Sequence, residues 1–143
     1  ISIGLVSKGE IISGLIFDPI KDELFYAEKN NGAFLNNQRL RVSKKNDIRD
    51  CLFATGGKIN EEIDFQHRKS GCAALDLAYV AAGRFDGYFQ YDLNLWDIAA
   101  GIIIVKEAGG IIEDINLSKH NNLKVIASNA NINPYLKEKL INF

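Results

Sequence analysis

The sequence predicts a layered α/β protein of the α+β kind, in which helices and sheets pack as alternating layers. Strand patterns cluster in the first half of the chain, whereas strand and helix patterns alternate in the second half. With 143 residues, 47% of them hydrophobic and 24% charged, the chain has the size and composition of one globular domain. It divides into an antiparallel meander, residues 1–57, and an α/β part, residues 58–143.

The first part alternates between short apolar stretches and turn signals. Gly9, Pro19 and Gly32 mark three of the turns, because glycine and proline favour the backbone angles that tight turns require. The stretches between them combine apolar and polar residues in the manner of strands with one face on a core. The expected strands are residues 1–6, 11–17, 23–28, 33–35, 39–42 and 52–55.

Helix patterns appear in the second part. Residues 71–82 are rich in alanine and end at Gly83, and residues 96–108 are apolar over about three and a half helical turns. The second of these helices has Asn94 as its expected N-cap and Gly109 as a left-handed residue after its end. Strands are expected at residues 85–91, 111–115 and 124–128, and no structure is predicted for residues 58–69.

A short helix is predicted at the end of the chain, from Asn133 to about residue 142. Asn133 followed by Pro134 fits an N-cap with proline at the first helical position. Tyr135, Leu136 and Leu140 would lie on one face of this helix.

Charge and composition exclude several classes of protein. The net charge is −1 and there is no long basic run, so the sequence offers no electrostatic case for nucleic-acid binding. No apolar stretch is long enough to span a membrane, and no signal peptide is visible. Cys51 and Cys72 do not form a disulfide framework, which favours a reducing cytoplasm. Because the chain contains no methionine and opens in a strand, we expect a fragment, a processed product, or a sequence from which an N-terminal part is omitted.

Asp97 is the first candidate for chemistry. It follows Trp96, the only tryptophan, at the start of the predicted helix, where the helix dipole favours a carboxylate and where a cation site can be built. The alternative is an ordinary acid that complements the dipole of a core helix.

Three ordered motifs carry a resemblance to a known family. They are residues 68–79 (RKSGCAALDLAY), residues 83–89 (GRFDGYF), and residues 95–110, which open with LWDIAAG and end with EAGG. Together they resemble the inositol monophosphatase-like, magnesium-dependent sugar phosphatases, most closely the bacterial branch called extragenic suppressor proteins. The resemblance covers nearly the whole chain and matches the C-terminal half of the family.

The resemblance implies a site and a reaction. A phosphorylated polyol or sugar would be hydrolysed by a water that Mg²⁺ activates, by a protein that is usually a homodimer. Asp97 would be a metal ligand that also lies near the sugar and contacts the substrate. The polyol would be held by Arg68, the backbone of Gly71, Cys72, Ala73 and Ala74, and Gln90. The remaining catalytic groups would lie upstream of Ile1, so residues 1–143 alone are expected to be inactive.

The chain also departs from the family. Gln90 stands where the family usually has a glutamate, and the segment between Gly57 and Arg68 is shorter than in relatives. Asp18-Pro19-Ile20 resembles the start of the catalytic signature of the family but is not followed by Asp-Gly-Thr, so we assign it to a turn. His67 and His120 are isolated and lack metal-ligand spacing.

Plainer alternatives accompany these assignments. Gly71 could simply open a helix, and Arg68 could be a solvated surface arginine. At the level of the whole chain, the alternative is a phosphatase-like remnant without activity that acts as a binding or regulatory module.

Overall fold

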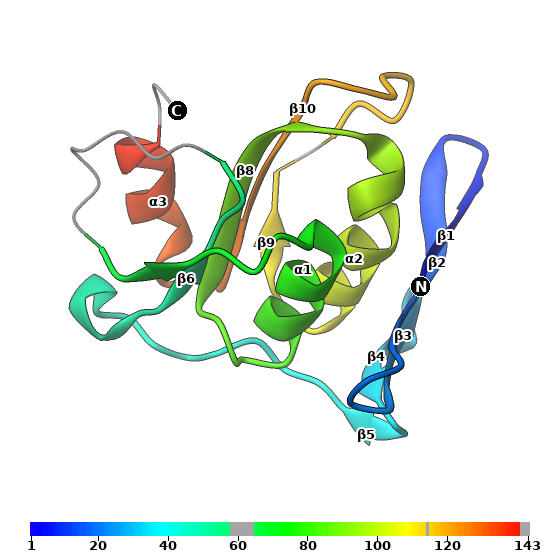
Figure 1. Cartoon of the computed structure of the whole chain (residues 1–143), viewed down its shortest axis with the longest axis horizontal. Helices are drawn as coiled ribbons and strands as arrows, with labels where there is room; N and C mark the ends of the chain where they lie inside the picture. Colours follow the sequence, from blue (N-terminus) through cyan, green and yellow to red (C-terminus); the bar gives the residue numbers. More distant parts are fainter. Residues whose placement is uncertain (58–64, 114, 141–143) are drawn as a thin grey trace.

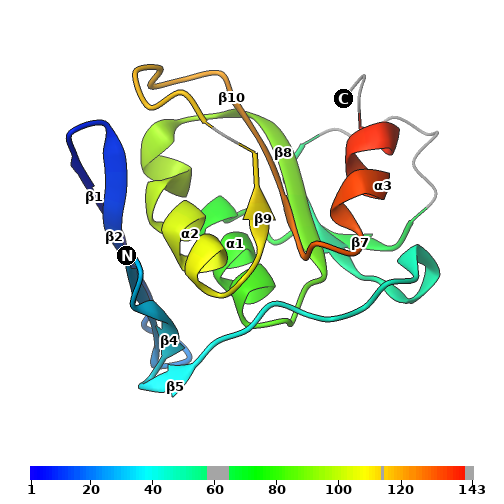
Figure 2. The same cartoon turned by 180° about the vertical axis from the view of Figure 1, so that it is seen from behind.

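The computed structural model describes residues 1–57, 65–113 and 115–140. The described residues form layers in the order sheet, helix pair, sheet, helix, and Figures 1 and 2 show this arrangement from opposite sides. The helices α1 (Ala73–Ala81) and α2 (Leu95–Glu107) lie between the two sheets, and α3 (Asn133–Lys139) covers the far face of the second sheet. This confirms the predicted layered α/β fold.

The first sheet is an antiparallel meander with strand order β1-β2-β3-β4-β5, but the strand expected at residues 52–55 of the meander lies in the second sheet instead. Its last strand is shorter than expected, because β5 ends at Arg39. The N–H of Val42 donates to the carbonyl of Ala108 at 3.1 Å, so the chain has already left the sheet and reached the end of α2. The strands are β1 (Ser2–Ser7), β2 (Glu10–Asp18), β3 (Glu23–Glu28), β4 (Gly32–Leu35) and β5 (Gln38–Arg39).

The second sheet has the order β7-β6-β8-β10-β9. The central strand β8 pairs in parallel with β6 and antiparallel with β10, and both of its faces are covered. Tyr88 faces the cluster that includes α1 and α2, and Phe89 faces Leu136 and Leu140 at α3. The strands are β6 (Phe53–Ala54), β7 (His67–Arg68), β8 (Gly87–Leu93), β9 (Ile111–Ile112) and β10 (Leu123–Ser128).

Both sheets meet at α2, which is buried from Ile98 to Val105. Gly14 of β2 faces Ala100 so closely that a Cβ at Gly14 would lie 2.6 Å from the carbonyl oxygen of Ala100. On the side facing α1, a Cβ at Gly101 would lie 2.6 Å from the Cβ of Leu77. Small residues thus allow the first sheet and α1 to approach the same helix.

The local signals at the helix ends behave as predicted. Asn94 is the N-cap of α2, and Gly109 follows its end with φ of 85°. Gly83 follows α1 with φ of 68°. These left-handed angles favour glycine, which has no Cβ to clash with the backbone.

The start of α3 differs from the prediction by one residue. Ile132 is the N-cap, and Asn133 is already helical, with its side-chain amide donating to the hydroxyl of Ser128 at 3.2 Å. The side-chain oxygen of Asn129 accepts instead, from the N–H groups of Asn131 at 2.8 Å and Ile132 at 3.1 Å. The predicted helix face was wrong at Tyr135, which is exposed, whereas Leu136 and Leu140 are fully buried. Residues 141–143 and the segment 58–64 lie outside the described residues.

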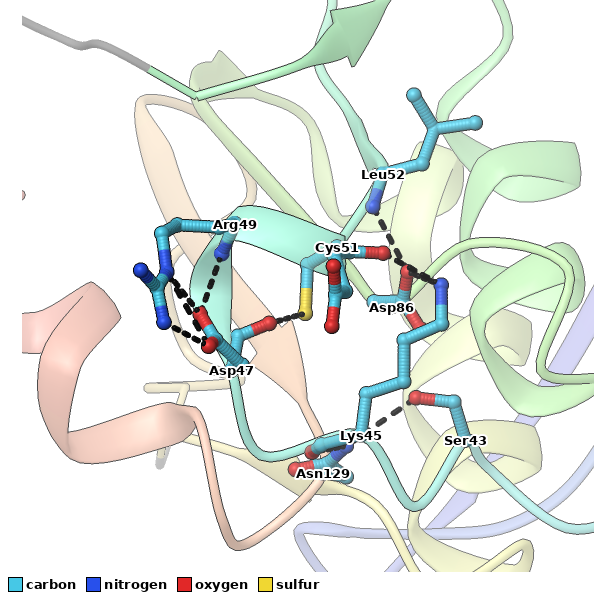
Figure 3. Close-up of polar contacts among 9 residues, drawn as sticks. Ser43, Lys45, Asp47, Arg49, Cys51, Leu52, Asp86 and Asn129 are labelled. Atoms are coloured by element: carbon cyan, nitrogen blue, oxygen red, sulfur yellow. Dashed lines mark hydrogen bonds and ion pairs between the residues drawn. The ribbon is translucent and has the colours of Figure 1, made fainter.

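A buried carboxylate fixes the connection between the two sheets (Figure 3). Asp86 is 3% exposed and accepts hydrogen bonds from Lys45 Nζ at 2.9 Å and from the N–H of Leu52 at 2.7 Å. Nearby, the Cys51 thiol donates to the carbonyl of Asp47 at 3.2 Å, and burial raises the pKa of this thiol to about 11. Cys51 therefore stays a protonated, unreactive core residue.

The Asp18-Pro19 pair is a turn, as the sequence predicts. Oδ1 of Asp18 accepts hydrogen bonds from the N–H groups of Ile20 at 3.0 Å and Lys21 at 3.4 Å, which is the pattern of an Asx turn. Tyr79 of α1 donates to the other oxygen of Asp18 at 3.5 Å. The pair thus ties the β2–β3 turn to α1.

Candidate active site

One cavity of about 480 Å³ lies where the N-terminal ends of α1 and α2 meet the end of β8. It brings together six of the seven predicted site residues, which come from three separate stretches of the chain. They are Gly71, Cys72, Ala73, Ala74, Gln90 and Asp97.

At the start of α1, the polar groups that line the cavity belong to the backbone. Cys72 is the N-cap but its side chain makes no capping hydrogen bond, and the first helical bond runs from the N–H of Asp76 to the carbonyl of Cys72 at 3.0 Å. The N–H groups in the first turn, including those of Ala73 and Ala74, have no carbonyl of their own helix to bond. Such a helix start favours an anionic or hydroxyl oxygen.

The approach to this helix start is fixed by Ser70. Its hydroxyl donates to Oδ1 of Asp76 at 2.6 Å and accepts from the N–H of Cys72 at 3.2 Å. Gly71 between them has φ of 82°, which permits the sharp entry into α1. Gly71 therefore opens the helix, as the plainer reading holds, and also lines the cavity.

Asp97 also combines a structural contact with a place on the cavity. Its Oδ2 accepts the N–H of Asn94 at 3.0 Å, which caps the start of α2. Among the described residues, no group donates a hydrogen bond to its other carboxylate oxygen, which could therefore bind a ligand or a cation. The dipole-complementing role and the metal-ligand role are thus compatible in one side chain.

The described residues do not by themselves make up a complete magnesium site. Mg²⁺ takes six oxygen ligands, usually one or two carboxylates together with waters and substrate oxygens. Asp97 and Asp92 both line the cavity and supply hard oxygen donors of this kind. In the described ranges, however, no group of three or more histidine, cysteine, aspartate or glutamate side chains is placed to hold a metal ion.

The buried side chain of Tyr88 holds the side chain of Gln90 in place. The Tyr88 hydroxyl donates to Oε1 of Gln90 at 2.7 Å. Gly56 leaves room for the amide, since a Cβ there would lie 2.8 Å from Cδ of Gln90. Neither Tyr88 nor Gly56 was among the predicted site residues, although Tyr88 lies within the second family motif.

Arg68 lies outside this cavity. It is exposed on β7, and its guanidinium donates to the carbonyl of His67 at 3.0 Å. Within the described structure its surroundings are those of a surface arginine, and its substrate-binding role stays a prediction.

A second hollow, of about 530 Å³, lies between the first sheet and the C-terminal half of α2. Its rim carries an ion pair between Glu10 and Lys29. Glu107 accepts the N–H groups of Asn30 and Gly32, both at 2.8 Å. These three charged groups are already paired in ways that hold the β3–β4 turn, so we place the candidate active site at the α1–α2 cavity.

Asp76 is the most unusual acid near the site. It is 1% exposed, and burial raises its pKa to about 6. The carboxyl keeps its proton in the folded protein between about pH 4 and pH 6, where the unfolded chain has already lost it. The free energy of unfolding should therefore decrease as the pH rises through this window.

Asp76→Asn should remove that pH dependence, because asparagine cannot ionise but still accepts from Ser70. A shift of about two pKa units corresponds to about 3 kcal/mol between pH 4 and pH 7. Urea unfolding across this range measures the slope, with Asp22→Asn as a control that removes an exposed acid. Equal slopes in Asp76→Asn and the unsubstituted protein would contradict a native carboxyl with a raised pKa.

Within the described residues, no helix is both long and apolar enough to cross a membrane.

Comparison with known proteins identifies the family. The pattern of the "Inositol monophosphatase family" matches residues 1–142. The chain is 44% identical to an inositol-1-monophosphatase of Rhizobium meliloti over 77% of its own length and 47% of that protein. It is 43% identical to the "Nus factor SuhB" of Pasteurella multocida, over 81% of this chain and 49% of the relative.

A solved structure agrees over nearly the whole chain. The extragenic suppressor protein suhB of Bartonella henselae superposes with a TM-score of 0.87 at 45% identity, covering 98% of this chain and 63% of that one. The chain spans about half the length of the curated relatives that it matches. Fold, motifs and relatives agree, and the chain belongs to the inositol monophosphatase family.

Proposed function

We propose that this chain is the C-terminal portion of a Mg²⁺-dependent phosphomonoesterase that hydrolyses inositol monophosphate or a related sugar phosphate. The observation that carries the proposal is the single cavity shared by the α1 helix start, Gln90 and Asp97. An anion-favouring helix start, a polar amide and a carboxylate are the groups that a phosphorylated polyol and its cation require.

Each wall of the cavity has its own part in this proposal. The N–H groups of Ala73 and Ala74 bind oxygens of the ligand, and Gln90 orients the polyol through its amide. Asp97 holds a cation with the carboxylate oxygen that Asn94 does not use. Bound Mg²⁺ supplies charge neutralisation of the phosphate and an acidified water.

The incomplete set of metal ligands predicts binding without turnover. We expect residues 1–143 to bind inositol monophosphate more tightly in millimolar Mg²⁺ than without it, and to release no phosphate. Isothermal titration measures the binding, and phosphate release from inositol monophosphate and p-nitrophenyl phosphate measures the turnover. Absence of binding would contradict the proposed function. Magnesium-dependent turnover by a clean monomer would mean that further acids, with Asp92 the first to examine, complete a metal site within this chain.

A regulatory module without activity is the second candidate. The absence of a three-residue metal cluster among the described residues favours it, as does a relative named as a Nus factor. The two candidates differ in the complete protein, because only an enzyme loses phosphate release when Asp97 is substituted. The reading frame upstream of Ile1 separates them as well, since an Asp-Pro-Ile-Asp-Gly-Thr signature there favours the enzyme.

We also propose a cytoplasmic homodimer. The edge strand β1 supports self-association, since Ile3, Leu5 and Val6 are 59%, 53% and 42% exposed. Exposed apolar side chains that gather on one surface favour contact with another chain.

A further inference from the structure

Tyr88 and Gln90 form a pair that fixes the chemical character of one wall of the cavity. They are two residues apart on β8, so their side chains leave the same face of the strand. Tyr88 is fully buried, and its hydroxyl lies 2.7 Å from Oε1 of Gln90. Gln90 lines the cavity, so the pair extends from the core to the site.

The direction of this hydrogen bond follows from the state of the phenol. Burial raises the pKa of Tyr88 above its ordinary value, and the charges of Asp76, Asp97 and Cys72 act in the same direction. The hydroxyl therefore keeps its proton, and leaving that buried O–H without an acceptor would be costly. The carbonyl oxygen of Gln90 is the acceptor, so it is the end of the amide that faces Tyr88.

The other end of the amide is left for the ligand. In the part of the chain that the structure describes, no protein group accepts a hydrogen bond from Nε2 of Gln90. Nε2 carries two N–H donors and cannot accept. A glutamate at this position would instead present a charged acceptor suited to sugar hydroxyls.

We infer that Tyr88 is a positioning residue that holds Gln90 as a hydrogen-bond donor toward the cavity. The subsite then favours phosphorylated sugars that present an acceptor there, such as the carboxylate oxygen of a sugar acid, over those that present a hydroxyl. This inference rests on the proposed function, because it requires a phosphate ester in the same cavity. It goes further than that function in two ways. It states that this subsite offers a hydrogen-bond donor rather than an acceptor, and it names Tyr88 as the residue that decides this.

A matched pair of substrates tests the inference. Gluconate 6-phosphate and glucitol 6-phosphate differ only in having a carboxylate or a hydroxymethyl group at the end remote from the phosphate. For the complete protein in millimolar Mg²⁺, we expect the kcat/KM ratio of the acid to the polyol to exceed one. Asp92 and Asp97 also line the cavity, so Kd values for both ligands are measured at the same magnesium concentration.

Two variants separate positioning from a merely structural role. Gln90→Glu should lower the ratio at least about tenfold, because the ligand carboxylate then faces a like charge. Tyr88→Phe should move the ratio toward one, because the freed amide can turn either end to the ligand. Tyr91→Phe removes a hydroxyl from the opposite face of β8 and should leave the ratio unchanged.

The possible outcomes test the subsite, the role of Tyr88 and the proposed function separately. Suppose that both ligands bind and that the kcat/KM ratio of the acid to the polyol is the same in the unsubstituted protein and in Gln90→Glu. This result overturns the inference and leaves the proposed function standing. A Tyr88→Phe variant that loses activity on both substrates equally overturns the positioning role of Tyr88. Failure of the unsubstituted protein to bind either phosphate overturns the proposed function together with the inference.

Discussion

Replacing Asp97 with asparagine is expected to lower the magnesium-dependent phosphatase activity of the complete protein by at least about 100-fold. Substitutions of residues that only orient metal ligands already cost 10–100-fold in metal affinity or activity, so loss of a ligand charge should exceed that. Asparagine has nearly the shape of aspartate and can still accept the N–H of Asn94, so α2 should keep its cap. The effect should therefore appear as a shift of the magnesium titration to higher concentration, with little change in thermal stability.

A control for this substitution lies at the other end of the same helix. Glu107 caps the β3–β4 turn by accepting the N–H groups of Asn30 and Gly32, far along α2 from the cavity. Glu107→Gln removes the same charge and should leave the magnesium titration unchanged. An unaltered titration in Asp97→Asn would contradict the metal assignment and leave this residue as a helix cap alone.

Gly14→Val should have the largest effect on stability, lowering the free energy of unfolding by about 3 kcal/mol or more. Besides the Ile103 side chain, a Cβ would meet the carbonyl oxygen of Ala100 at 2.6 Å and the Cα of Ala100 at 2.8 Å. These are backbone atoms of α2, so no rotamer change can relieve the contact and the first sheet would have to separate from the helix. Chemical denaturation measures the loss.

The neighbouring position provides the matched control. Ser13 lies on the opposite face of β2, where valine suits a strand, so Ser13→Val should change the stability by no more than about 0.5 kcal/mol. Similar unfolding free energies for Gly14→Val and Ser13→Val would contradict the close packing of β2 on α2.

The elements that the sequence predicted well have local signals at their ends. Asn94 and Gly109 bound α2 because capping and a left-handed C′ residue depend on the immediate neighbours. The end of β5 was not predictable in this way, since Val42 leaves the sheet to bond with Ala108, which is distant in the sequence. Tyr135 was misplaced because periodicity in a seven-residue helix leaves the buried face poorly determined.

The residues of the site that belong to a sequence motif could be predicted. The roles that depend on tertiary packing could not. The resemblance pointed to the α1 helix start, Gln90 and Asp97, and one cavity unites them. Asp76 lies in the first motif and Tyr88 in the second. The roles of the Asp76 carboxyl and the Tyr88 hydroxyl depend on contacts that a linear pattern does not contain. Asp92 lines the cavity with φ of 60°, a backbone conformation that its sequence neighbours did not suggest.

Under the proposed function, a phosphorylated polyol and its cation occupy the cavity between the starts of α1 and α2. The most direct measurement is a two-dimensional NMR titration of the ¹⁵N-labelled protein with inositol monophosphate in millimolar Mg²⁺. We expect the chemical shift changes to concentrate at the backbone amides of Cys72, Ala73 and Ala74, the side-chain amide of Gln90 and the backbone amide of Asp97. Changes that instead cluster around Lys29 and Glu107, or spectra that do not change at saturating ligand, would contradict it.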